Sequence, residues 1–142
     1  MKKLFLVATF FVAVAFILES CKKTSSKYID ETLDMDTSAV LKYSGDFISG
    51  PYGIVTGMGK VYLQNGRYIV GLENFNTGSG PDLKIYLSKE MIPVNFISLG
   101  SLRSTNGNQL YEVPGTPDFT QYKYVLIHCE QFNHLFGSAE LR

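Results

Sequence analysis

Asn65-Gly66 is the strongest local constraint on the fold, because it lies between two runs of residues that favour extended structure, KVYLQ and RYIVGL. A two-residue hairpin with a type I′ turn needs positive φ at both central residues, and Asn-Gly adopts those angles at the least cost. The pattern therefore predicts a β-hairpin through residues 60–72.

The chain from residue 39 onward has the same character throughout. Short apolar runs recur between glycine, proline and asparagine, and no stretch shows a convincing period of 3.6 residues, so no helix is expected. In residues 82–88, Leu83, Ile85 and Leu87 alternate with Asp82, Lys84 and Ser88, and Tyr86 lies on the second face, which predicts one buried and one mostly solvated face. The remaining expected strands are Val40–Ile48, Ile54–Thr56, Asn95–Leu99, Gln109–Val113, Tyr122–Cys129 and Leu135–Leu141. About eight or nine short antiparallel strands predict one all-β domain over residues 39–142, a β-sandwich or small barrel.

The first twenty residues are expected to be a signal peptide. Two lysines precede an apolar run over residues 4–18, which is shorter than the roughly 20 residues of a spanning helix. The run ends in Leu18-Glu19-Ser20-Cys21, which looks like a lipobox, in which Cys21 receives lipid and becomes the new N-terminus. Ordinary secretory cleavage, which would leave Cys21 able to pair with Cys129, is the alternative. Residues 21–38 are polar and dense in charge, so they are expected to form a flexible tether.

The charge balance excludes some partners. The chain carries 13 Lys and Arg against 13 Asp and Glu, and neither nucleic acid nor an anionic membrane surface is indicated without a basic cluster. The membrane is therefore expected to be reached through lipid on Cys21. Neither a Ser-His-carboxylate pattern, a P-loop nor a dinucleotide fingerprint is present, so a catalytic enzyme is the least favoured class.

The whole predicted β domain resembles the DM-thirteen family, a small extracellular domain found beside DOMON domains and in Skeletor-like animal proteins. Five groups of residues in order carry the resemblance: YSGDF at 43–47; ENF at 73–75 with GPDLKIYLS at 80–88; LGSL at 99–102; GNQLY at 107–111; and IHC at 127–129 with Phe132, Phe136-Gly137, Ala139 and Leu141. The resemblance implies an all-β fold and a proposed part in electron transfer, with Cys129 as the redox thiol or a metal ligand. Two positions depart from the family pattern: His128 stands where a tryptophan is common, and His134 stands where an apolar residue is common.

Cys129 is the central candidate residue, because lipid on Cys21 would leave it without a partner in an oxidising compartment. Strand alternation places Val125, Ile127 and Cys129 on one face and His128 on the other. A turn through residues 130–133 would bring His134 back beside Cys129, where an imidazolium would lower the pKa of the thiol. The alternative for Cys129 is a buried, inert thiol, and for His134 a half-buried structural histidine. Exposure of the sulfur is expected to discriminate between the two.

A metal ion at Cys129, with His134 as second ligand, is a further candidate. A blue-copper site is disfavoured, because His128 faces away and no methionine follows Met91. Zinc would need carboxylates that the sequence does not locate. Asp82 is interpreted as a turn residue. The nine tyrosines, with Asn74, Asn76 and Asn106 near glycines, are compatible with a sugar-binding surface, although tyrosine is also common in sheets.

Two functions are carried forward from the sequence. The first is a lipid-anchored envelope protein of a Gram-negative bacterium, facing the periplasm, whose Cys129 transfers electrons to or from a partner redox protein. The second is a non-catalytic binding or scaffolding lipoprotein, with a protein or carbohydrate ligand, in which Cys129 only packs.

Overall fold

The computed structural model describes residues 29–31 and 35–142, and the predicted signal peptide, Cys21 and most of the predicted tether lie outside them. The described residues form nine strands and no helix, so no described helix is available to cross a membrane. The strands are β1 (Ile29–Asp30), β2 (Val40–Ser49), β3 (Val55–Gln64), β4 (Arg67–Thr77), β5 (Leu83–Ser88), β6 (Phe96–Ser101), β7 (Asn106–Glu112), β8 (Tyr124–Cys129) and β9 (His134–Glu140).

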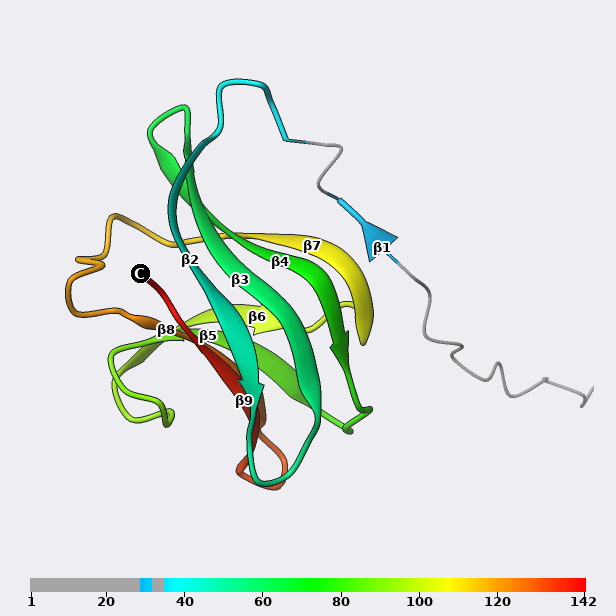
Figure 1. Ribbon diagram of the computed structural model, residues 1–142. Helices are drawn as coiled ribbons and strands as arrows, with labels where there is room; N and C mark the ends of the chain where they lie inside the picture. The colour runs from blue at the N-terminus through cyan, green and yellow to red at the C-terminus, as the bar shows by residue number, and fades with distance from the viewer. Residues whose placement is uncertain (1–28, 32–34) are drawn as a thin grey trace, which may run out of the picture.

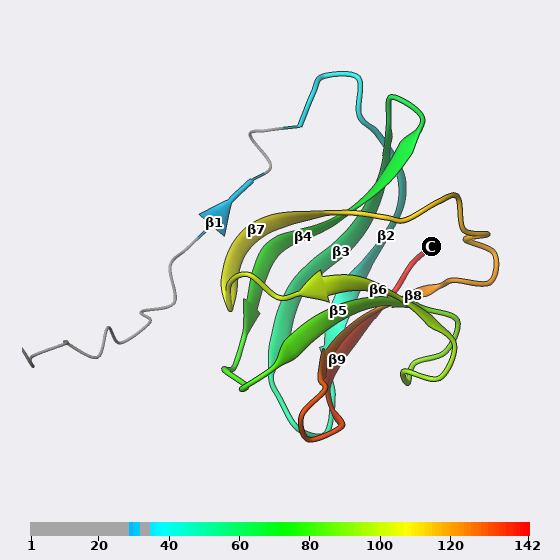
Figure 2. The same ribbon diagram turned by 180° about the vertical axis from the view of Figure 1, so that it is seen from behind.

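The strands form one curled sheet in the order β1-β7-β4-β3-β2-β9-β8-β5-β6. Every pairing except that of β1 with β7 is antiparallel, so the predicted all-β fold of eight or nine antiparallel strands is confirmed as a nearly closed barrel. The long, curved β2, β3 and β4 lie over β5, β8 and β9, as both views show (Figures 1 and 2). The core fills the space between these two halves.

The predicted Asn65-Gly66 hairpin is confirmed. Both residues have positive φ, 50° and 77°, and Gln64 pairs with Arg67 on either side of the turn. The predicted separate strand Ile54–Thr56 is instead the start of β3, which continues to Gln64. A register shift after Thr56, beside Gly57 at a φ of 102°, bends the strand without ending it. This bulge interrupts the local β signal, which is why the sequence pattern divides the strand.

β2 joins the two halves of the barrel, because its first part pairs with β3 and its last part with β9. Gly45 lies where the strand changes partner. A Cβ at that position would lie 2.0 Å from the carbonyl oxygen of Glu140. Only glycine permits this close approach of the two backbones.

Part of the predicted tether contacts the domain. β1 pairs in parallel with β7. The Glu31 carboxylate accepts a hydrogen bond from the Leu110 amide at 2.8 Å and forms an ion pair with Arg103 at 2.6 Å. The contacts at residues 29–31 therefore place this segment on the edge strand β7.

Candidate functional site

Cys129 is the last residue of β8, and its side chain points into the core. Val125, Ile127 and Cys129 expose 0 % of their surface and belong to the hydrophobic core cluster between the two halves of the barrel. Leu126 and His128 are also buried but lie outside that cluster. The alternation predicted from the sequence is confirmed. Cys129 is a free cysteine, and the strand period directs its side chain into the apolar core.

His134 lies directly opposite Cys129, as the first residue of β9. The turn between them closes through a hydrogen bond from the Asn133 amide to the Glu130 carbonyl at 3.2 Å, and Asn133 has a φ of 53°. Directly opposed residues of an antiparallel pair share one face of the sheet. The predicted turn through residues 130–133 is therefore confirmed, and it brings His134 beside Cys129.

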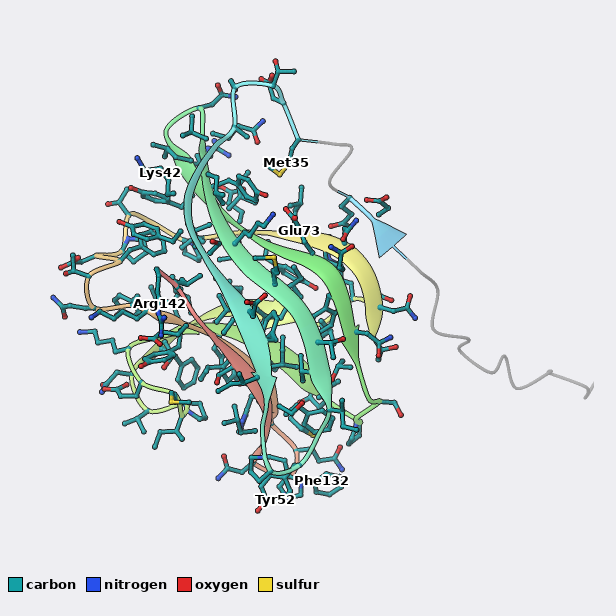
Figure 3. All side chains as sticks on the ribbon, viewed as in Figure 1. Met35, Lys42, Tyr52, Glu73, Phe132 and Arg142 are labelled. Atoms are coloured by element: carbon teal, nitrogen blue, oxygen red, sulfur yellow. The ribbon has the colours of Figure 1, made fainter. Side chains whose placement is uncertain are left out.

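The loop between β2 and β3 lies along the start of β9. The Gly50 amide donates to the Phe136 carbonyl at 2.6 Å, and the Tyr52 ring stacks on the His134 ring with centroids 3.7 Å apart. Phe132 lies 5.8 Å from the same imidazole, and Figure 3 shows Tyr52 and Phe132 together at one end of the barrel. These contacts place Tyr52 and Phe132 against His134, the residue opposite Cys129.

The outer face of β5 and β8 holds a second cluster that the sequence pattern did not identify. Tyr86 exposes 1 % of its surface and its hydroxyl donates to a Glu130 carboxylate oxygen. The Phe96 ring stacks on Tyr86 with centroids 4.1 Å apart, and the His128 ring lies 5.8 Å away. With Pro93 and Asn133 these residues line a shallow cavity of about 280 Å³.

This cluster corrects the prediction that the second face of β5 is mostly solvated. Tyr86 and Ser88 are both buried there. The segment from Lys89 to Asn95 returns to the strand, and the Ser88 hydroxyl donates to the Ile92 carbonyl at 3.2 Å. The burial of Tyr86 and Ser88 depends on residues outside β5 that cover this face, and the alternation along the strand does not reveal them. An aromatic residue on the expected polar face, Tyr86, was the available signal.

Charge and burial set the protonation of the outer cluster. Burial, reinforced by the hydrogen bond to Glu130, raises the pKa of Tyr86. Burial lowers the pKa of His128, so the imidazole is neutral at pH 7, and its Nδ1 is buried without a hydrogen-bond partner. The Lys84 ammonium pairs with Asp82 at 2.8 Å, and this contact raises the pKa of Lys84.

The family model described as "Electron transfer DM13" matches residues 53–141. The chain belongs to the DM13 family. Neither the comparison with curated proteins nor that with solved structures found a match to this chain. The DM13 match includes Cys129, His134 and the outer cluster. β2 (Val40–Ser49) precedes the matched region, yet its pairing with both β3 and β9 completes the barrel.

The two residues predicted to hold a metal ion, Cys129 and His134, lie opposite each other across β8 and β9. No group of three or more His, Cys, Asp or Glu side chains suited to a metal ion occurs in the described part of this DM13 protein. His128, the other histidine, lies on the opposite face of β8. Structural zinc requires four ligands and a catalytic zinc three. Cys129 and His134 alone fall short of either set.

Asp82 lies in the turn before β5, as expected. Its carbonyl accepts a hydrogen bond from the Glu130 amide at 3.0 Å, and its carboxylate pairs with Lys84. Asp82 therefore links the start of β5 to the turn that follows Cys129.

Proposed function

We propose that this DM13 protein is an electron-transfer lipoprotein of a Gram-negative cell envelope. The observation that carries the proposal is the family match over residues 53–141, which contains the unpaired Cys129. The apolar run that ends at Ser20-Cys21 supports a lipid anchor on Cys21. The domain faces the periplasm and exchanges electrons with a partner redox protein.

Cys129 is the proposed redox thiol and His134 the residue that tunes its pKa. Their direct pairing across β8 and β9 supports these roles, because a nearby imidazolium favours the thiolate, which is the reactive form. The thiolate attacks a disulfide of the partner, a mixed disulfide forms, and the second sulfur of the partner leaves as a thiolate. Since Cys129 is buried, the Tyr52–His134 contact opens before the attack.

A second candidate function is a binding or scaffolding lipoprotein in which Cys129 packs the core. The 0 % exposure of Cys129, among Val125 and Ile127, favours it. In such surroundings a thiol behaves as a small hydrophobic side chain, and burial keeps it inert. The two candidates differ in one measurable property, the reactivity of the thiol in the folded protein.

Alkylation of the folded full-length protein by iodoacetamide, followed over a range of pH, tests the proposal. Metal content is determined first, and Cys129→Ser identifies the labelled residue. The proposal expects the thiol of the native protein to be labelled. His134→Gln should slow the labelling, whereas His128→Gln, which changes the imidazole on the opposite face, should not.

The absence of labelling in the folded protein would contradict the proposal. If Cys129 reacts only when the protein unfolds, and no metal accompanies the native protein, the thiol packs the core. The binding or scaffolding function then replaces electron transfer at Cys129.

A further inference from the structure

A hydrogen-bonded tyrosine–carboxylate pair lies on the outer face of the barrel, on the side of β8 away from the Cys129 thiol. Tyr86 projects from the middle of β5, and Glu130 is the first residue after β8. The Tyr86 hydroxyl donates to the Glu130 carboxylate, and the Glu130 amide is held by the Asp82 carbonyl at 3.0 Å. Strand pairing and this backbone contact together fix the carboxylate at the phenol.

Neighbouring side chains bury nearly all of Tyr86. The ring exposes 1 % of its surface, and Phe96 covers it in a stacked arrangement with centroids 4.1 Å apart. Phe96 itself exposes 40 % of its surface. The two rings therefore connect a buried phenol to the surface of the protein through one aromatic contact.

The protonation of the pair suits a coupled loss of one electron and one proton. Burial raises the pKa of Tyr86, so the neutral phenol is the stable form and an isolated phenolate is disfavoured. Removal of an electron from a neutral phenol makes the hydroxyl proton strongly acidic. The Glu130 carboxylate already accepts that proton in a hydrogen bond and is the base in position to take it.

A second tyrosine–carboxylate pair in the same barrel differs in the charge beside the acceptor. The Tyr62 hydroxyl donates to Glu73, but Lys60 also binds the Glu73 carboxylate, at 2.5 Å. The Glu73 carboxylate is therefore shared between the phenol and an ammonium ion. Glu130 forms no described salt bridge, and the nearby Lys84 ammonium, which interacts with it electrostatically, is in contact with Asp82 instead. Tyr62 is therefore a matched control for Tyr86.

We propose that Tyr86 is a one-electron redox site whose hydroxyl proton moves to Glu130. On oxidation the O–H bond of Tyr86 breaks, the electron passes by way of Phe96 to a one-electron acceptor, such as the haem or copper centre of a partner, and the proton bonds to the Glu130 carboxylate. On reduction the electron returns and the proton moves back. The inference rests on the proposed electron-transfer function, but it does not require chemistry at Cys129.

The test uses the full-length protein and hexachloroiridate(IV), a one-electron oxidant that does not enter protein cores. Samples are frozen after mixing, and the radical is measured by electron paramagnetic resonance. We expect a tyrosyl signal that narrows when the protein contains ring-deuterated tyrosine. Tyr86→Phe should abolish the signal, and Tyr62→Phe should retain it.

Glu130→Gln tests the proton acceptor separately. Gln keeps an oxygen that accepts the Tyr86 hydrogen bond but is far less basic than a carboxylate. Radical formation should slow by about 100-fold, the lower end of the effect of a positioned proton acceptor. Far-ultraviolet circular dichroism confirms that each variant keeps its β structure. If Tyr86→Phe does not fold, the Glu130→Gln rate still decides the outcome, because Glu130 accepts the hydrogen bond of Tyr86.

Three results would overturn the proposal: no tyrosyl signal in the folded wild type, a signal that persists in folded Tyr86→Phe, or an unchanged rate in folded Glu130→Gln. The same measurements in Cys129→Ser separate the two hypotheses. A Tyr86 signal that survives in a protein whose Cys129 is inert contradicts only the thiol chemistry. A reactive Cys129 without a Tyr86 signal contradicts only the tyrosine site.

Discussion

Tyr52 stacks on His134 with 3° between the ring planes, and this contact joins the loop after β2 to the first residue of β9. His134 is also the register partner of Cys129. The stack therefore lies beside the residue that faces the thiol, and we expect its loss to ease access of a reagent to Cys129. Tyr52 exposes 55 % of its surface, so its loss removes the ring contact without leaving a cavity in the core.

Tyr52→Ala is expected to increase the rate of Cys129 alkylation in the folded protein by roughly 5- to 30-fold, which corresponds to about 1–2 kcal/mol in the opening equilibrium. Phe96→Ala is the matched control, because it removes another exposed stacked ring on the outer face of the sheet. Mass spectrometry of the labelled peptide measures both rates. Equal acceleration in the two variants would show a global rather than a local effect.

Gly66→Val is expected to lower the free energy of unfolding by about 1–3 kcal/mol, because it forces a β-branched residue to positive φ. No atom lies within 4 Å of a Cβ at Gly66, so the cost is conformational rather than steric. Gly78→Val is the control, since that site is equally open but lacks the positive φ. Urea denaturation followed by circular dichroism measures both, and equal losses would contradict the role of the turn.

His128 should make the stability of the protein depend on pH in the weakly acidic range. Burial lowers the pKa of His128 in the folded state, so the unfolded chain binds the proton more readily. Stability is complete above the unfolded pKa of about 6.5 and is lost as pH falls from there toward the lower folded pKa. One such group changes the unfolding free energy by at most about 1.4 kcal/mol per pH unit.

The measurement is a urea titration between about pH 7.5 and pH 5, above the range in which ordinary carboxylates titrate. His128→Gln should lose less stability than the wild type over that range. Parallel pH profiles of the two proteins would show that His128 is not the responsible group.

Cys21→Ser is expected to abolish lipid attachment and leave the protein soluble or unprocessed. Acyl chains contribute about 0.8 kcal/mol per buried methylene, and more than one chain is needed for stable anchoring. Cys21 lies outside the described residues, so the test is biochemical: incorporation of labelled fatty acid and membrane fractionation. Cys129→Ser is the control for loss of a cysteine and should fractionate as the wild type does. An unlabelled wild type would exclude the lipid anchor.

Local patterns in the sequence determined the all-β class, the Asn65-Gly66 hairpin and the inward direction of Cys129. Each depends on residues that are close in the chain: two turn residues with positive φ, or the alternation of neighbours along one strand. The pairing of His134 with Cys129 could also be predicted, because only the four residues 130–133 separate them in the chain.

The tertiary structure alone decided how those strands are covered. Tyr86 lies on a face of β5 that strand alternation predicts to be mostly solvated, yet it exposes only 1 % of its surface. His128, on the outer face of β8, exposes only 4 %. Phe96, which covers Tyr86, follows a loop after β5, and Glu130 reaches it from the end of another strand. Such contacts depend on the order of strands in the sheet, which joins residues far apart in the chain and is not encoded in the period of any one strand.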